Sequence, residues 1–167
     1  VFLGGEYKKR NMVSQLHIGV RRNPNTEIYE KLGLDRGADC IGQAISVEHV
    51  IQLFDAMHRG NGLPRTIVYS LDPALCYPLG TISGSFPGVV LGSAWWFSDN
   101  LRKTIDQIKN IAETAHIGSF YGMTTDSRSF LSYARHEYFR KIFCSVVGEW
   151  IESGEVVDAQ NAKDLVK

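Results

Sequence analysis

Short apolar runs alternate with helical stripes along this chain, and this alternation constrains its fold more than any other feature. Strand-like runs occupy residues 13–20, 66–71, 89–94 and 120–123. Each is followed by a segment in which apolar residues recur at helical spacing, as they do over residues 138–151. Four strand and helix units in succession require parallel strands joined by helical crossovers. We therefore predict an α/β protein with a parallel sheet.

Capping residues indicate where the helices begin. Ser46 is a good N-cap for the first long helix, and the pair Asp72-Pro73 provides a cap and a first-turn proline for the next one. Ser98 or Asp99 is expected to cap the third helix, because both precede its apolar stripe.

The first predicted strand and the loop after it carry polar residues. Alternation along the strand places Leu16, Ile18 and Val20 on one face and His17 on the other. The following polar loop runs from residue 21 to about Gln43. This is longer than the ~15 residues of an ordinary connector, which suggests a binding loop.

Composition places the chain among ordinary globular proteins. Hydrophobic residues make up 44% and charged residues 22%, and 18 Lys and Arg balance 18 Asp and Glu. A balanced charge creates no field that favours nucleic acid or an anionic membrane, and no apolar run approaches the ~18 residues of a membrane span. The 3 cysteines have no close spacing, which argues against disulfides and fits a reducing cytosol. We therefore expect a cytoplasmic protein that binds neither nucleic acid nor membrane.

Two architectures suit four parallel units: a small doubly wound sheet, or half of an eight-stranded (β/α) barrel of the TIM type. No strand is followed by the glycine fingerprint of a nucleotide fold or by a P-loop. The chain also begins inside a predicted helix, at residues 4–10. We therefore favour the half barrel.

At the end of the fourth predicted strand, Asp126 and Arg128 lie two residues apart. Ligands of parallel α/β folds bind at the carboxyl ends of the strands, so this pair is the strongest functional lead. Its position alone fits two roles for Asp126 equally well: a structural residue that caps the following loop, or a functional residue. For His17, a lone histidine on a strand, position alone favours a buried core residue over a ligand.

Four sequence blocks help to decide between these structural and functional interpretations. They are Gln15-Leu16-His17-Ile18-Gly19 with Arg22-Asn23 and Asn25, Leu63-Pro64-Arg65-Thr66-Ile67-Val68-Tyr69, Trp95-Trp96-Phe97, and Thr125-Asp126-Ser127-Arg128-Ser129-Phe130-Leu131-Ser132-Tyr133 through Arg140. Together they resemble the uronate isomerase (glucuronate isomerase) family, metal-dependent barrels related to the amidohydrolases. The resemblance implies that residues 1–167 are a partial (β/α)8 barrel domain with strands five to eight. The N-terminal half, with a metal-binding His-x-His on its first strand, would then lie outside this sequence.

The resemblance also implies roles for individual residues. Asp126 matches the family residue that binds the metal, zinc by resemblance, and exchanges protons with the substrate. Arg128 matches the arginine that grips the substrate carboxylate, and Arg22 is a second candidate for that contact. His17 is expected to be a metal ligand or a donor beside one. Trp95 and Trp96 are expected to divide between burial against helices and a wall for the sugar.

The function implied is an isomerase that interconverts D-glucuronate with D-fructuronate and D-galacturonate with D-tagaturonate. The metal would polarise the substrate oxygens while Asp126 moves a proton. Two alternatives stay open: a metal-dependent hydrolase of the amidohydrolase kind, and an inactive half-barrel fragment that associates with itself. We expect a homo-oligomer that binds a hexuronate substrate and uses no organic cofactor, and an isolated 167-residue chain without activity.

Overall fold

The computed structural model describes residues 1–42, 45–60, 62–156 and 158–166. Within these residues the main sheet has three parallel strands in the order β1-β4-β5, namely β1 (Val13–Ile18), β4 (Arg65–Ser70) and β5 (Val89–Leu91). The central strand β4 is buried from Thr66 to Ser70, because both faces of the sheet are covered there. The predicted α/β fold with a parallel sheet is confirmed.

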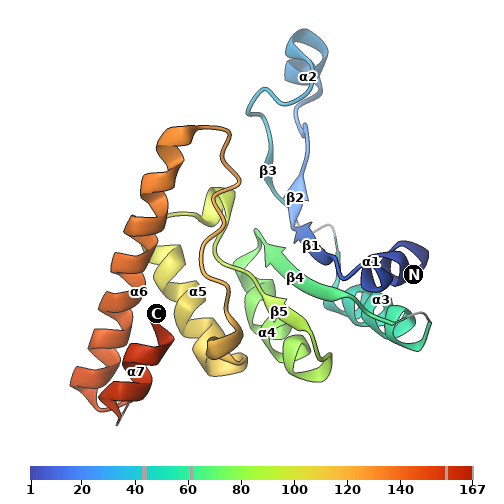
Figure 1. Cartoon of the computed structure of the whole chain (residues 1–167). Coiled ribbons are helices and arrows are strands. Elements are labelled where there is room, and N and C mark those ends of the chain that lie inside the picture. The colour runs from blue at the N-terminus through green and yellow to red at the C-terminus, as the bar shows by residue number, and fades with distance from the viewer. Residues whose placement is uncertain (43–44, 61, 157, 167) are drawn as a thin grey trace.

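Most of the remaining elements are helices that lie to either side of this sheet, and one helix lies at the tip of a projecting arm (Figure 1). The helices are α1 (Phe2–Lys9), α2 (Thr26–Leu32), α3 (Val47–Arg59), α4 (Cys76–Ser85), α5 (Leu101–Thr114), α6 (Ala134–Ser153) and α7 (Ala159–Leu165). Short 3₁₀ turns are η1 (Pro73–Leu75), η2 (Trp96–Ser98), η3 (Ile117–Ser119) and η4 (Phe130–Tyr133). In the described part of the chain, no helix is both long enough and apolar enough to cross a membrane.

One face of the sheet packs against helices α3 and α4. The Ser46 side chain accepts a hydrogen bond from the backbone N–H of His49 at 3.3 Å, so the predicted cap of α3 is confirmed. Phe54 of α3 is fully buried in the same apolar cluster as Val68 of β4. Burying a side chain of this size stabilises the fold by about 1.5–3 kcal/mol. The helical stripe thus fixes which side of the sheet α3 covers.

The opposite face of the sheet has its own cluster, made of Ile67, Tyr69, Leu71 and Trp95. Val20 packs here rather than beside Leu16 and Ile18, so the prediction that these three share a face is wrong. Gly19 lies between them with a φ of 86°, a left-handed conformation that interrupts the alternation of the strand.

The predicted long loop is an arm that projects from the rest of the molecule (Figure 1). It contains β2 (Val20–Arg21), which pairs antiparallel with β3 (Cys40–Ile41), and α2 between them. No residue of α2 is buried. Gln43, where the loop was expected to end, lies outside the described residues. The simple loop prediction is corrected to a short ribbon with a helix at its tip.

The predicted strand at residues 120–123 does not form, since none of the described strands includes them. Gly122 has a φ of 75°, which breaks the extended conformation that a ladder needs. The segment nevertheless contributes to the core, as its apolar residues indicate. Met123 is only 8% exposed and packs with Phe139 and Val146 of α6. Of the four predicted strands, three therefore form and pair in the sheet, and the fourth is an irregular segment.

The start of α5 also differs from the prediction. Asn100 is its N-cap, and the side chain accepts from the backbone N–H of Lys103 at 3.1 Å. Neither Ser98 nor Asp99 has this role. The Asp99 carboxylate instead forms an ion pair with Arg135, near the start of α6.

Candidate functional site

The carboxyl ends of β4 and β5 lead to the candidate site. After β5 the chain runs to Trp95, whose ring is 6% exposed and belongs to the cluster on the sheet face away from α3 and α4. Trp95 Nε1 donates a hydrogen bond to Asp126 Oδ2 at 3.2 Å. Asp126 has a φ of 46°, a left-handed conformation that Asp tolerates better than most residues. A buried indole therefore holds one oxygen of a strained, exposed carboxylate.

His17 lies beside this pair, on the face of β1 opposite Leu16 and Ile18, as predicted. Its ring stacks on Tyr69 at 4.5 Å between centroids and meets the Trp95 ring edge-on at the same distance. Partial burial between these rings lowers the pKa of His17, and the negative charge of Asp126 opposes that change. The environment thus favours the neutral imidazole, the form that can accept a proton or bind a metal.

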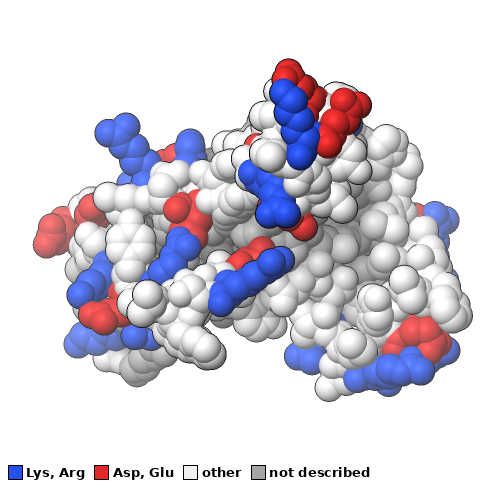
Figure 2. Space-filling view, turned by 90° about the horizontal axis from the view of Figure 1, so that it is seen from above, with Lys and Arg blue, Asp and Glu red and all other residues white. Residues whose placement is uncertain are grey.

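A cavity of about 440 Å³ opens next to Asp126. It is lined by Arg22, Trp95, Trp96, Asp99, Thr125, Asp126, Ser127 and Arg135. Seen from the side on which the arm projects, positive and negative side chains are interspersed around the central hollow (Figure 2). Four of the predicted site residues, Asp126, Trp95, Trp96 and Arg22, therefore come together in one place.

Arg22 reaches this cavity from the base of the arm. Its guanidinium forms ion pairs with Asp35 and, at 3.3 Å through Nε, with Asp39. Its central carbon also lies 5.9 Å from the centroid of the Trp96 ring, within the range of a cation–π contact. The two carboxylates and the indole hold Arg22 at the edge of the cavity.

The two tryptophans differ from the prediction in one respect. Trp95 is the buried ring, but it packs on the sheet face that carries His17 and Tyr69, not against helices. Trp96 lines the cavity and is 37% exposed, so its ring is open to solvent there. Both indoles line the cavity, which fits the expected wall for a sugar.

Arg128 is the predicted site residue that the structure places elsewhere. It is exposed, does not line the cavity, and has no hydrogen bond or ion pair with another described residue. Arg135 and Asp99 line the cavity although sequence reasoning did not select them. The available signal was their position: Asp99 lies two residues after the Trp95-Trp96-Phe97 block, and Arg135 lies within the final block.

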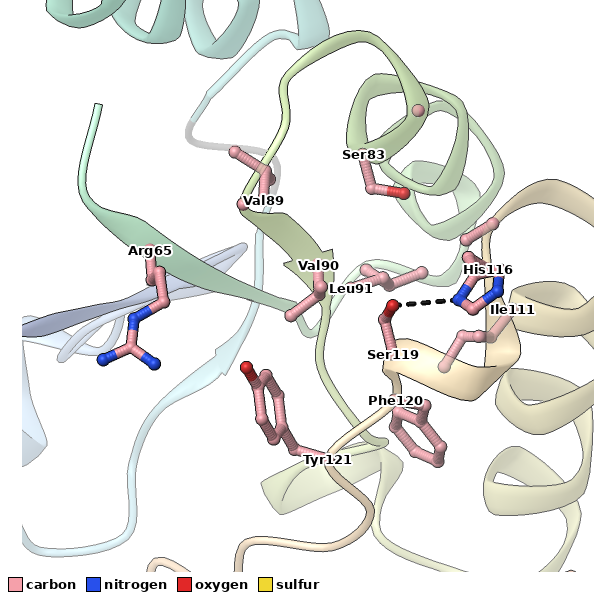
Figure 3. A pocket seen from close by; sticks show the side chains of 13 residues that line it. Arg65, Ser83, Val89, Val90, Leu91, Ile111, His116, Ser119, Phe120 and Tyr121 are labelled. Atoms are coloured by element: carbon pink, nitrogen blue, oxygen red, sulfur yellow. Dashed lines mark hydrogen bonds between the residues drawn. The ribbon is translucent and has the colours of Figure 1, made fainter. Parts of the chain in front are cut away.

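Another cavity, of about 270 Å³, lies where β4 and β5 begin, at the other end of the sheet. Figure 3 shows Arg65, His116 and Ser119 on its walls, with His116 Nδ1 joined to Ser119 Oγ at 2.9 Å. None of the predicted site residues reaches it. Ligands of parallel sheets bind at the carboxyl ends of the strands, so the cavity beside Asp126 is the candidate site.

The donors of this chain do not by themselves fit a zinc site. Among the described residues, no group of three or more His, Cys, Asp or Glu side chains could hold a metal ion. Asp126 and His17 are two donors at most, whereas zinc usually takes three or four protein ligands. The disagreement concerns the number of ligands, since carboxylate and imidazole are both of a type that zinc accepts.

Trp95→Phe tests the indole contact. The substitution keeps an aromatic ring but removes the N–H that holds Asp126, a hydrogen bond to a charged group worth about 1.5–3 kcal/mol. In the complete protein we expect kcat/KM to fall roughly tenfold to a hundredfold. Trp150→Phe, a buried indole of α6 in a different cluster, is the control that should alter the melting temperature only. Equal activity of the two variants would show that Trp95 packs without orienting Asp126.

Fold and site together define an α/β protein whose parallel sheet carries a polar cavity, lined by two carboxylates and two arginines, beyond the ends of its strands. The family model for glucuronate isomerase matches residues 1–167. The chain belongs to the glucuronate isomerase family, and the resemblance found in its sequence blocks is confirmed.

Individual relatives agree with this assignment. The chain is 47% identical over 162 residues to the uronate isomerase of Caldanaerobacter subterraneus, an overlap of 93% of this chain and 35% of that protein. The crystal structure of uronate isomerase from Thermotoga maritima matches with a TM-score of 0.90 and 32% identity, covering 99% of this chain and 36% of the other. The glucuronate isomerase structure from Caulobacter crescentus gives a TM-score of 0.88 at 25% identity, with 98% and 34% covered. The chain thus spans about a third of the length of these relatives.

Proposed function

We propose that this chain supplies the Asp126 site of a uronate isomerase that interconverts D-glucuronate with D-fructuronate and D-galacturonate with D-tagaturonate. The observation that carries the proposal is the Asp126 carboxylate, held by Trp95 at the carboxyl edge of a parallel sheet beside a cavity with two arginines. Family membership and the uronate isomerase relatives support the same reaction.

Aldose–ketose isomerisation moves one proton between C2 and C1 of the open-chain sugar. Asp126 has the chemistry of the base that takes this proton from one carbon and returns it to the other. The second carboxylate oxygen stays available for the proton, because only Oδ2 accepts from Trp95. Trp96 provides an apolar wall for the carbon chain, and Arg22 adds positive charge at the edge of the cavity, which favours an anionic sugar. Arg128 remains a predicted carboxylate ligand, two residues from Asp126.

We propose that zinc binds only in the complete protein. Asp126 and His17 would be the donors from this chain, and the others would come from the part of the isomerase that this chain does not span.

We also propose that residues 1–167 form strands five to eight of a (β/α)8 barrel. The match of nearly the whole chain to the Thermotoga maritima enzyme supports it. β1, β4 and β5 would be three of these strands, and residues 120–123 the fourth.

Turnover in deuterated water tests the proposed reaction. The complete protein that contains this chain should convert D-glucuronate to the ketose and place solvent deuterium on C1, because the abstracted proton exchanges at the carboxylate base. Products are measured by NMR, with an amide substrate in parallel to detect hydrolase activity. Hydrolysis of the amide without ketose formation would favour the hydrolase alternative, and no turnover of either substrate would contradict the proposal.

A further inference from the structure

Arg135 is a cationic cavity residue that has no role in the predicted site. It lies in the first turn of α6 and lines the same cavity as Asp126. Its guanidinium forms an ion pair with Asp99, 36 residues away in the sequence, at the turn that precedes α5. This pair joins the two segments that flank the cavity.

The two partners of this pair are exposed very differently. The Asp99 side chain is only 7% exposed, whereas that of Arg135 is 37% exposed. The pair therefore presents its cationic side to the cavity and keeps its anionic side in the protein. A guanidinium has five N–H donors, and a single bond to Asp99 leaves others for a ligand.

The other arginines of the region are less suited to a new anion. Arg22 already spends donors on two carboxylates, Asp35 and Asp39, and one face of its guanidinium lies near the Trp96 ring. Arg128 does not line the cavity. Among the described residues Arg135 pairs with one carboxylate, that of Asp99, so it is the cation of the cavity with the most free hydrogen-bonding capacity.

We infer that Arg135 binds the carboxylate of the hexuronate, and that Asp99 is the positioning residue that orients it. This inference rests on the proposed function. An open-chain hexuronate carries its reacting carbonyl at one end and its carboxylate at the other. A cavity that accepts it needs a base and a cation on separate walls, and Asp126 and Arg135 provide them. The planar fork of arginine matches a carboxylate with two parallel hydrogen bonds, which favours uronates over neutral hexoses.

The test compares D-glucuronate with D-glucuronamide, in which an uncharged amide replaces the carboxylate. In the complete protein, Arg135→Gln should raise KM for glucuronate tenfold to a hundredfold and change that for glucuronamide little, because a charge-assisted contact is lost only with the acid. The KM of Arg135→Lys for glucuronate should lie between those of the parent and Arg135→Gln, since lysine keeps the charge but not the planar guanidinium. Asp99→Asn should weaken the preference for the acid less than Arg135→Gln does.

Arg140→Gln is the matched control, because Arg140 lies on the same helix, is exposed, and does not line the cavity. It should leave the preference for glucuronate unchanged. Binding of glucuronate by calorimetry and the melting temperature of each variant are recorded alongside. If Arg135→Gln and Arg135→Lys raised KM equally for glucuronate and glucuronamide, the inference would be overturned and Arg135 would have a structural role. A parent protein that neither binds nor isomerises glucuronate would overturn the proposed function itself.

Discussion

Asp126→Asn in the complete protein should lower kcat for glucuronate isomerisation by about 10²- to 10⁴-fold, the usual cost of losing a general base. The amide keeps the shape of the carboxylate and its Oδ1 can still accept from Trp95 Nε1, but it cannot take a proton at neutral pH. The backbone should also tolerate the change. Asn adopts the left-handed conformation as readily as Asp, so the φ of 46° adds no new strain.

Asp55→Asn is the control for this experiment. Asp55 is a half-exposed carboxylate on α3 that pairs with Arg59 and does not line the cavity. Its loss should leave kcat unchanged and shift the melting temperature little, as expected for a surface ion pair. Turnover within a few-fold of the parent for Asp126→Asn, with the same fold by circular dichroism, would exclude Asp126 as the base.

The 167-residue chain produced by itself should show no isomerase activity and should self-associate. In the described residues β1 and β5 each pair only with β4, so both present free backbone donors and acceptors. An apolar groove of about 650 Å³ follows β1 and α1, and Phe2, Met12 and Val13 are exposed along it. Exposed apolar surface next to an open strand edge favours association. Two donors should also hold zinc only weakly.

Sedimentation, zinc content and ketose formation measure these three outcomes together. Val13→Lys should reduce association, because a charge on an edge strand blocks pairing with another chain. Ile151→Lys, an exposed apolar position on α6, is the matched control that should leave association unchanged. A monomer that binds one zinc and isomerises glucuronate would refute the prediction and show a complete site within these residues.

Sequence reasoning succeeded where a few neighbouring residues decide the structure. The Ser46 cap of α3 and the Asp72-Pro73 start of η1 both formed as predicted, the latter with Asp72 accepting from the Ala74 N–H at 2.9 Å. The buried strand β4 and the apolar stripe of α6 also formed. Capping and periodicity act over a few residues, so they can be read without knowing what lies across the fold.

Predictions failed where a distant segment bound the same residue, or where a glycine reversed the backbone locally. Asp99 had the chemistry of an N-cap, but its ion pair with Arg135 left that position to Asn100. Residues 120–123 had the composition of a strand, but Gly122 adopts a positive φ and no ladder forms. Side-chain alternation past Gly19 failed for the same kind of reason, a local reversal that composition does not reveal.

The sequence by itself determined the three parallel strands of the main sheet, the long helices α3, α5 and α6, the family, and the candidate residues Asp126, Arg22, Trp95 and Trp96. Only the tertiary structure decided which of their neighbours share the cavity. The Trp95 contact to Asp126 joins positions 31 residues apart, and the Asp99 contact to Arg135 joins positions 36 apart. Such contacts depend on how a strand end, a turn and a helix start come together in space. Hydrophobic packing of the elements between them sets that arrangement, and no local pattern encodes it.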